Sequence, residues 1–331
     1  MKRVLKGLAV LVMLALFAFM LTAWWFLRWD EIDPPELPGM VASDSLVHDG
    51  LSRTWTSYVP SSRADSPALL ILLHGSLGNG DFMRASTFFE FDILAERNGF
   101  VVAYPDGFEQ HWNDCRASAA YSANVRKIDD VGFLQAMIDK LVAEQGVDPE
   151  QVYAAGLSNG GHMAFRLGLE APELVAGIAA YAANLPVADN LDCEPRGVAL
   201  PVLVINGTED PVNPYAGGLV EIFGDASRGS VRSAAQTVQY WAELAGYGGA
   251  GQQVNWPETS ADDDTSVRSL SWSAPGLPAV QLLSVVGGGH TFPHPLYKQS
   301  RFAGTTSHEF NGAQVTWQFF SQGLPVAAGA Q

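Results

Sequence analysis

The sequence Gly156-Leu157-Ser158-Asn159-Gly160-Gly161 lies between a short apolar run, 151–155, and an amphipathic segment, 162–170. A strand, a Gly-x-Ser-x-Gly turn and a helix in this order are typical of a nucleophile elbow, which exposes a serine at the carboxyl edge of a sheet. The turn is tight and the serine backbone is strained, so glycines must flank it. The alternative interpretation is that Ser158 is only a small residue in a turn. The stretch therefore predicts a nucleophilic serine, and this prediction depends on whether the rest of the chain supplies a base and an acid for it.

Apolar runs of strand length alternate with amphipathic segments on both sides of this elbow. We predict strands at 53–60, 68–73, 100–104, 151–155, 175–182, 202–205, 267–272 and 281–286. We predict helices at 89–98, 131–145, 162–170, 231–245 and 310–320, and irregular chain over most of 246–278. This alternation predicts an α/β fold, a mostly parallel sheet with helices on both faces.

Three polar residues follow the ends of three predicted strands: Ser158, Asp210 and His290. The carboxyl ends of parallel strands share one edge of the sheet, where ligands bind, so we expect these side chains to meet. Imidazole can take a serine proton near neutral pH, and a carboxylate fixes the tautomer of that imidazole. Because the order serine, acid, histidine is that of α/β-hydrolases, the sequence predicts a catalytic triad on that fold.

Two members of this triad have simpler alternatives. Asp210 precedes Pro211 and could merely begin a turn. His290 competes for the role of base with other histidines, of which His111 and His294 could line a cleft. The remaining competitors are His48, which precedes the first predicted strand, His74, His162 on the elbow helix, and His308. Strand-end position and chain order favour His290.

Acyl transfer at a serine also needs hydrogen-bond donors that are in place before negative charge develops. The backbone N–H of Asn159, directly after the predicted nucleophile, is one donor. The glycine-rich loop 74–80 is expected to supply the other from Ser76 or its neighbour Leu77, because glycines let a backbone approach a substrate closely. We expect His74 to order this loop.

The N-terminus predicts a membrane-spanning helix. Positive charges within 2–6 precede an uncharged apolar run, 7–27, which would span about 30 Å as a helix. Trp24 and Trp25 near its far end suit the aromatic belt of a membrane interface. The alternative is a cleavable signal peptide, although its apolar region is usually shorter and no Ala-x-Ala site follows. Residues 1–28 are therefore predicted to be a signal-anchor or signal peptide, with the body of the protein exported.

The remaining chain divides into three predicted parts. The acidic, proline-rich stretch that begins at Asp30 predicts an extended linker over 29–47. Residues 48–322 are predicted to form the catalytic domain, and 323–331 a flexible tail. A net charge of −16 argues against a nucleic-acid partner, because binding phosphates needs a basic face.

The two cysteines, Cys115 and Cys193, fall in predicted loops of an exported domain, where a disulfide is permitted. The alternative is two independent thiols. Asp129 and Asp130 precede a predicted helix and are interpreted as structural, capping residues.

No cofactor or metal site is predicted. The run 262–264, three aspartates, lacks the spaced oxygen pattern of a calcium loop and is interpreted as a solvated charge run. The glycosylation sequon 206–208 lies at a strand end beside the predicted site and is interpreted as a chance match.

A series of short motifs along the chain resembles the motifs of a known family. They are Asp49-Gly50-Leu51-Ser52-Arg53 with Tyr58-Val59-Pro60, Leu73-His74-Gly75, Arg97-Asn98-Gly99-Phe100 with Tyr104-Pro105-Asp106-Gly107, Trp112-Asn113, Asp129-Asp130-Val131-Gly132-Phe133, the elbow 156–161, Asn206-Gly207-Thr208-Glu209-Asp210-Pro211 and Gly287-Gly288-Gly289-His290-Thr291. In this order, over about 48–320, the chain resembles exported polyhydroxybutyrate depolymerase-like esterases, which are related to feruloyl and acetylxylan esterases of carbohydrate esterase family 1.

The resemblance implies a serine esterase that needs no cofactor, with Ser158 as nucleophile, Asp210 as acid and His290 as base. It further implies an ester substrate, small or polymeric, and a substrate pocket lined by Trp112 and Tyr215 with His74 nearby. No protein partner is implied. The alternatives are an exported serine peptidase of the same fold and a non-catalytic, hydrolase-like binding protein.

Three departures from the family pattern affect the substrate rather than the chemistry. Asn206 stands where a histidine is usual, and Phe292 where a tryptophan is usual after the catalytic histidine. Residues 246–248 replace a region that often carries a cysteine.

Overall fold

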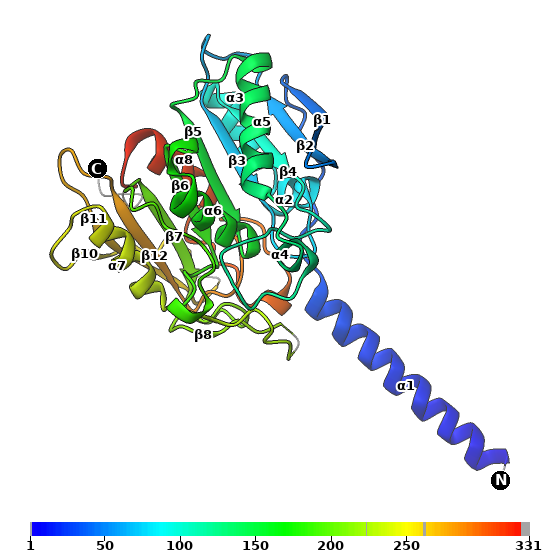
Figure 1. Cartoon of the computed structure of the whole chain (residues 1–331). Coiled ribbons are helices and arrows are strands. Elements are labelled where there is room, and N and C mark those ends of the chain that lie inside the picture. The colour runs from blue at the N-terminus through cyan, green and yellow to red at the C-terminus, as the bar shows by residue number, and fades with distance from the viewer. Residues whose placement is uncertain (1, 223, 261–262, 326–331) are drawn as a thin grey trace.

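A ten-stranded sheet with the order β1-β2-β4-β3-β5-β6-β7-β12-β11-β10 forms the centre of the computed structural model, which describes residues 2–222, 224–260 and 263–325 (Figure 1). Its strands are β1 (Met40–His48), β2 (Leu51–Val59), β3 (Leu69–Leu73), β4 (Val101–Pro105), β5 (Val152–Leu157), β6 (Gly177–Tyr181), β7 (Val202–Gly207), β10 (Gln252–Asn255), β11 (Ser266–Trp272) and β12 (Val280–Val286). A separate two-stranded ribbon joins β8 (Gly218–Leu219) to β9 (Ser230–Val231).

The six central strands, from β4 to β12, pair in parallel, and antiparallel strands extend the sheet at both ends. Parallel pairing requires crossover connections, which explains why helices separate these strands along the chain. Every residue of β3, β4 and β6 is buried, as expected for strands covered on both faces.

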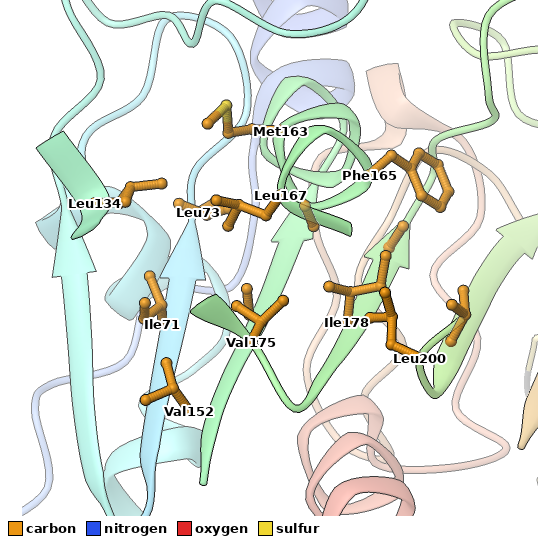
Figure 2. Close-up of a cluster of buried hydrophobic side chains, with 14 of the residues drawn as sticks. Ile71, Leu73, Leu134, Val152, Met163, Phe165, Leu167, Val175, Ile178 and Leu200 are labelled. Atoms are coloured by element: carbon orange, nitrogen blue, oxygen red, sulfur yellow. The ribbon is translucent and has the colours of Figure 1, made fainter. Parts of the chain in front are cut away.

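Helices cover both faces of the sheet. They are α2 (Gly80–Ser86), α3 (Glu90–Asn98), α4 (Ser122–Val125), α5 (Asp130–Gln145), α6 (Asn159–Glu170), α7 (Ala234–Leu244) and α8 (Gly312–Gln322), with the short 3-10 turns η1 (Pro172–Leu174), η2 (Ala188–Asn190) and η3 (Arg301–Ala303). One core layer lies beneath α5, α6 and α7, where Leu73 of β3 and Leu167 of α6 both belong to the buried cluster (Figure 2). The second layer lies beneath α3 and α8, with Phe91 and Phe319 among its members.

The helix α1 (Lys2–Leu27) projects away from the domain (Figure 1). Its segment Lys6–Leu27 is long and apolar enough to cross a membrane, and its most apolar window is not buried against the protein. Burial in a protein core, which would be an alternative for an apolar helix, is therefore excluded for this window.

The predicted strands and helices are found within a few residues of their expected positions, but several shorter or exposed elements were missed, among them β1, β10 and α2. The linker prediction for 29–47 is wrong from Met40 onward, because β1 pairs antiparallel with β2 along its whole length. Polar residues interrupt the apolar pattern of this half-exposed strand, so it resembles a linker in sequence. The strand β10 in the region predicted as irregular is likewise an exposed edge strand, and α2 is only a short helix after the glycine-rich loop. Most of the predicted tail, 326–331, lies outside the described residues.

Candidate active site

The predicted elbow is present at the junction of β5 and α6. Ser158 has φ 56° and ψ −117°, a left-handed conformation that costs of order 1–3 kcal/mol for a residue with a side chain. Its N–H donates to the carbonyl of Tyr181 at 2.8 Å, and its own carbonyl accepts from His162 at 3.0 Å. The turn is therefore held in its strained form by hydrogen bonds to β6 and to the first turn of α6.

The two glycines of the motif are required by close contacts between backbones. A Cβ on Gly160 would overlap the backbone carbonyl of Leu73 at the end of β3, and a Cβ on Gly156 would overlap Gly160 itself. The elbow thus crosses directly over the end of the neighbouring strand, with no room for a side chain.

We expect Gly160→Ala to lower the free energy of unfolding by about 1–3 kcal/mol, because the added methyl group must displace two backbone segments. Urea unfolding of the purified chain in detergent, followed by tryptophan fluorescence, measures this change. Gly248→Ala is the matched control, since nothing lies within 4 Å of its added Cβ. Equal stabilities for the two variants would contradict the proposed crowding at the elbow.

The predicted acid and base lie in direct contact. His290 Nδ1 is 2.7 Å from Asp210 Oδ2, while Asp210 Oδ1 accepts backbone N–H groups from Val212 at 2.7 Å and Asn213 at 2.8 Å. The Asp210 side chain is 1% exposed and the His290 side chain 12% exposed. An ionised carboxylate at this position assigns the proton to Nδ1, which leaves Nε2 of His290 as a proton acceptor.

The loops that carry the acid and the base are bonded to each other. They follow β7 and β12, which are neighbouring parallel strands. The Thr208 hydroxyl accepts from Gly287 N–H at 2.9 Å, and Glu209 N–H donates to the carbonyl of Gly288 at 2.9 Å. These contacts fix the two loops relative to each other, so the backbone sets the hydrogen-bonded contact between Asp210 and His290.

The elbow lies at the same edge of the sheet as this pair, since β5, β7 and β12 run parallel within it. His162, one helical turn beyond Ser158, is close enough to His290 for their charges to interact. Burial, followed by the charge of Arg116, lowers the pKa of His162 well below its ordinary value. The imidazole next to the base is therefore neutral, and it remains on the elbow helix as predicted.

The loop expected to bind an oxyanion lies beside the serine. A Cβ on Gly75 would be 3.5 Å from Cβ of Ser158. Leu77 N–H donates to the carbonyl of Gln110 at 2.9 Å, so this N–H is not available to bind an oxyanion. Of the two donors considered for this loop, Ser76 is therefore the better candidate, together with Asn159 at the N-terminus of α6.

His74 and Trp112 lie behind this loop and are fully buried. His74 Nδ1 is 2.7 Å from the carbonyl of Gly75, and its Nε2 accepts from Gly107 N–H at 2.9 Å. The indole N–H of Trp112 donates to the carbonyl of His74 at 3.0 Å, and the two rings are 5.0 Å apart. His74 thus orders this loop, as predicted. Neither side chain is exposed, so the substrate contact expected of Trp112 is not found, and Trp112 supports the loop instead.

Burial lowers the pKa of His74 to about 4. Since the unfolded chain takes up this proton near pH 6.5, the folded protein should lose stability as pH falls from about 6.5 toward 4. We expect the contribution of His74 to the free energy of unfolding to fall by about 2 kcal/mol between pH 7 and pH 5. Urea unfolding of the native chain and of His74→Gln at both pH values measures it. Identical losses in the two proteins would contradict the assignment.

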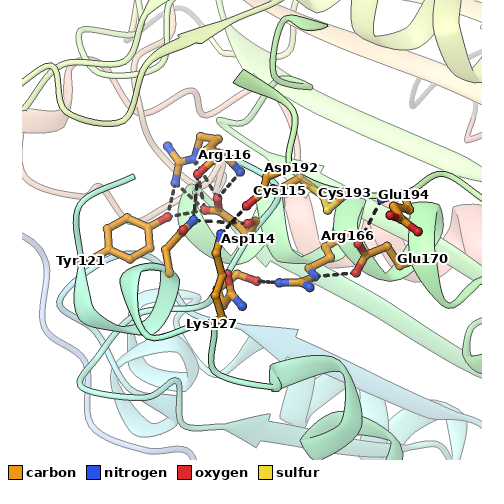
Figure 3. Close-up of a disulfide and its surroundings, with 12 residues drawn as sticks. Asp114, Cys115, Arg116, Tyr121, Lys127, Arg166, Glu170, Asp192, Cys193 and Glu194 are labelled. Carbon is orange, nitrogen blue, oxygen red and sulfur yellow. Dashed lines mark hydrogen bonds and ion pairs between the residues drawn. A yellow bond between two sulfur atoms is a disulfide. The ribbon is translucent and has the colours of Figure 1, made fainter. Parts of the chain in front are cut away.

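The side chain of Asn159 fastens α6 to the loop 112–121. Its Oδ1 accepts from Trp112 N–H at 2.8 Å, and its Nδ2 donates to Asp114 Oδ2 at 2.6 Å. Asp114 is also paired with Arg116 at 2.6 Å and accepts from the Tyr121 hydroxyl at 2.5 Å (Figure 3). Burial opposes ionisation of Asp114, but the ion pair outweighs it and lowers its pKa to about 2. This buried network was not predicted from the sequence.

Cys115 and Cys193 form a disulfide next to this network (Figure 3). The bond joins residues 78 positions apart, so by loop-closure entropy it stabilises the fold by about 4 kcal/mol. It ties the loop 112–121 to the chain that follows β6, and the pairing left open by the sequence is found in the structure.

Three other residues expected near the substrate have structural contacts. Tyr215 is half-buried, and its hydroxyl lies 2.6 Å from Ser284 Oγ of β12. His294 is buried, and its two ring nitrogens contact Glu90 and the N–H groups that follow it. His111, the other histidine expected in the cleft, is stacked on Tyr121 with ring centroids 4.6 Å apart.

Three polar motifs of the sequence have structural roles or positions that can be stated. Asp129 caps α5 and Asp130 pairs with Arg53, which confirms that both are structural. The Asn206 side chain is buried and bonded to Ala183, so the sequon is inaccessible in the folded chain. Of the aspartate run, position 262 lies outside the described residues.

Among the described residues, His48, Asp49 and Asp129 form a cluster whose ligand atoms lie within 4.8 Å of one another. Arg126 and Lys127 line the same hollow, and their positive charge opposes binding of a cation there. We assign no metal to this cluster.

The chain is similar to several known esterases. Esterase NocK of Nocardia uniformis subsp. tsuyamanensis, whose own assignment is provisional, is 28% identical over 77% of this chain and 74% of its own length. Feruloyl esterase B of Piromyces equi is 29% identical over 67% of this chain, and poly(3-hydroxybutyrate) depolymerase of Ralstonia pickettii is 32% identical over 44%. This chain spans only 39% and 31% of the lengths of these last two proteins.

Among solved structures, the acetyl xylan esterase from Aspergillus awamori has a TM-score of 0.53 at 16% identity, and covers 76% of this chain and 95% of its own. At this identity the likeness concerns the fold alone, and it confirms the predicted α/β-hydrolase fold. A family model described as esterase PHB depolymerase matches residues 53–239, more than half of the chain. The chain therefore belongs to the esterase PHB depolymerase family and is a carboxylic ester hydrolase.

Proposed function

We propose that this chain hydrolyses carboxylic esters through an acyl-enzyme formed on Ser158, with His290 as general base and Asp210 as its orienting acid. The observation that carries the proposal is the buried contact between Asp210 and His290, fixed by bonded loops at the sheet edge where the strained Ser158 lies. Strain of this kind persists only where the surrounding structure imposes it, and it is concentrated at functional sites.

In the first half-reaction, Nε2 of His290 takes the hydroxyl proton of Ser158 while Oγ attacks the ester carbonyl. The backbone N–H groups of Asn159 and Ser76 hold the oxyanion, with the positive end of the α6 dipole beside it. The tetrahedral intermediate collapses, and His290 gives its proton to the leaving alcohol. Water then repeats the sequence on the acyl-enzyme, so the acid is released and Ser158 regains its proton.

For the substrate, we propose an ester of a hydroxyalkanoate, a hydroxycinnamate or acetate. The three relatives named above as poly(3-hydroxybutyrate) depolymerase, feruloyl esterase and acetyl xylan esterase cleave, by their names, bonds that share only the ester group. A panel of p-nitrophenyl acetate and butyrate, methyl ferulate, acetylated xylan and hydroxybutyrate oligomers tests the acyl preference. We expect turnover of the p-nitrophenyl esters. The proposal would be overturned if the chain hydrolysed none of the esters in the panel.

For the location, we propose that α1 remains attached as a signal-anchor, with the catalytic domain on the outer side of the membrane. The exposed apolar surface of α1 and the positive residues in its first turns support this orientation. Membrane fractionation with an alkaline wash tests the anchor. The full chain should stay in the pellet, whereas a shortened chain in the soluble fraction would show that the segment is cleaved.

A further inference from the structure

The end of α1 is docked on the catalytic domain. Ser300 Oγ donates to the carbonyl of Phe26 at 2.9 Å, and Arg301 Nη1 donates to the carbonyl of Trp25 at 3.3 Å. The guanidinium of Arg301 also lies 4.4 Å from the centre of the Trp25 ring. The hydrogen bonds from Ser300 and Arg301 use carbonyl groups in the last turn of α1, which have no partner within the helix, so they act as a C-terminal cap. We call residues 24–30 the neck.

The neck continues beyond the helix as a bonded segment rather than a free tether. Asp30 N–H donates to the carbonyl of Lys298 at 3.0 Å, and Lys298 N–H donates to Asp30 Oδ2 at 3.0 Å. The ring of Trp29 lies 5.7 Å from that of Phe82 on α2. The neck therefore contacts both α2, which follows the oxyanion loop, and the segment 297–304, which follows the base.

The segment 297–304 also supports the base directly. His290 N–H donates to the carbonyl of Ala303 at 2.6 Å, and Gly289 N–H donates to the carbonyl of Thr305 at 2.9 Å. Both segments that touch the neck leave the sheet at its carboxyl edge. Figure 1 accordingly shows α1 leaving the domain at the end where α4 and β8 lie. The membrane helix and the catalytic triad thus share one end of the molecule.

Exposed apolar side chains are present at this same end. They are Leu77 in the oxyanion loop, Phe82 on α2, Val125 on α4, Leu219 on β8 and Leu296 between the base and the neck, all at least 50% exposed. Single exposed apolar residues are ordinary. These five, however, are carried by loops and short elements around the active-site edge, and we call them the apolar rim.

In a membrane that holds α1, the neck would lie at the level of the lipid headgroups. Trp24 and Trp25 are the residue type that gathers at membrane interfaces, and Arg28 lies 5.2 Å from the centre of the Trp24 ring. Because the docked neck is only a few residues long, the headgroup level lies next to the carboxyl edge of the sheet. The outer leaflet of a membrane that holds α1 would therefore lie beside the apolar rim.

We propose that the outer leaflet of the membrane that holds α1 covers the apolar rim, and that the substrate is an ester embedded in that leaflet. The acyl chain would enter the active site from the membrane side, with the scissile carbonyl at headgroup level. This inference rests on the proposed esterase activity and on the retained anchor, and it names how the substrate is presented. A dissolved polysaccharide ester or a free polymer would have no need of this orientation.

Site-specific labelling tests the orientation without requiring activity. Both native cysteines form the disulfide, so Leu296→Cys and Val125→Cys each add one free thiol for an environment-sensitive fluorophore. The control is Leu277→Cys, 41% exposed in the turn at the amino end of β12, away from the triad. In phosphatidylcholine vesicles that contain spin-labelled phosphatidylcholine, we expect quenching at 296 and 125 and none at 277. Labels at 296 and 125 that are quenched no more than the control would overturn the proposal.

A longer neck tests the consequence for substrate choice. A flexible Gly/Ser segment of about 12 residues inserted after Ala23, between the membrane-spanning part of α1 and the docked neck, adds roughly 20 Å between membrane and domain. We expect turnover of p-nitrophenyl palmitate in the vesicle bilayer to fall at least tenfold, while that of p-nitrophenyl acetate in solution stays unchanged. The same insertion at Gly276, which has nothing within 4 Å, is the control. If the variant with the longer neck hydrolysed the ester in the bilayer as fast as the native chain, the inference would be overturned. If the native chain hydrolysed neither ester, the proposed function would be overturned instead.

Discussion

Replacing Ser158 with alanine is expected to lower kcat for p-nitrophenyl butyrate by roughly 10⁵-fold or more, because the hydroxyl that forms the acyl-enzyme is lost. The oxyanion donors remain, so KM should change little. Stability should change little too, since alanine also has a Cβ and must adopt the same left-handed backbone, φ 56°. Initial rates of p-nitrophenol release measure the effect.

The control for this variant is Ser62→Ala, at an exposed serine. It should retain the native rate. Retention of more than about one hundredth of the activity by Ser158→Ala, with the stability unchanged, would contradict the role of Ser158, because a missing nucleophile in a triad costs far more.

Replacing Asp210 with asparagine is expected to lower kcat by about 10⁴-fold. An asparagine Oδ1 can still accept the N–H groups of Val212 and Asn213, which then places its Nδ2 toward His290 Nδ1. An N–H donor there forces the proton of the imidazole onto Nε2, so the base can no longer accept the serine proton. The fold should be preserved because the shape of the side chain is almost unchanged.

Glu209→Gln is the matched control for this second prediction, because Glu209 is the adjacent carboxylate and its side chain is exposed. The same kinetic assay should give native rates for it. A loss of less than tenfold in Asp210→Asn would mean that the contact with His290 is structural and that another group orients the base.

The parts of this structure that the sequence predicted well are those whose causes are local. The apolar runs of β3 and β4 become strands because they are buried on both faces, and the elbow forms because Gly156 and Gly160 leave room for crossing backbones. The contact between Asp210 and His290 could be predicted because parallel strands place their carboxyl ends at one edge, although the two residues are 80 positions apart in the chain.

The parts that were missed depend on which segments meet in the folded chain. The strand β1 has a half-exposed face with polar residues, so only its pairing with β2 reveals it. Trp112 was expected to face substrate, but it is fully buried and its indole N–H is bonded to the carbonyl of His74. The second role of Asn159, as a link to Asp114 through its side chain, arises only because the loop 112–121 packs onto α6. Cys115 is the single local sign that this loop is held in place.

The measurement that tests the central claim most directly is peptide mapping by mass spectrometry after reaction with a fluorophosphonate probe. The proposed mechanism predicts one covalent adduct, on the peptide that contains Ser158, and no adduct in Ser158→Ala. It also predicts a much slower reaction in Asp210→Asn, because the hydroxyl of Ser158 is no longer activated. An adduct on a different residue, or none on a chain that hydrolyses p-nitrophenyl butyrate, would contradict it.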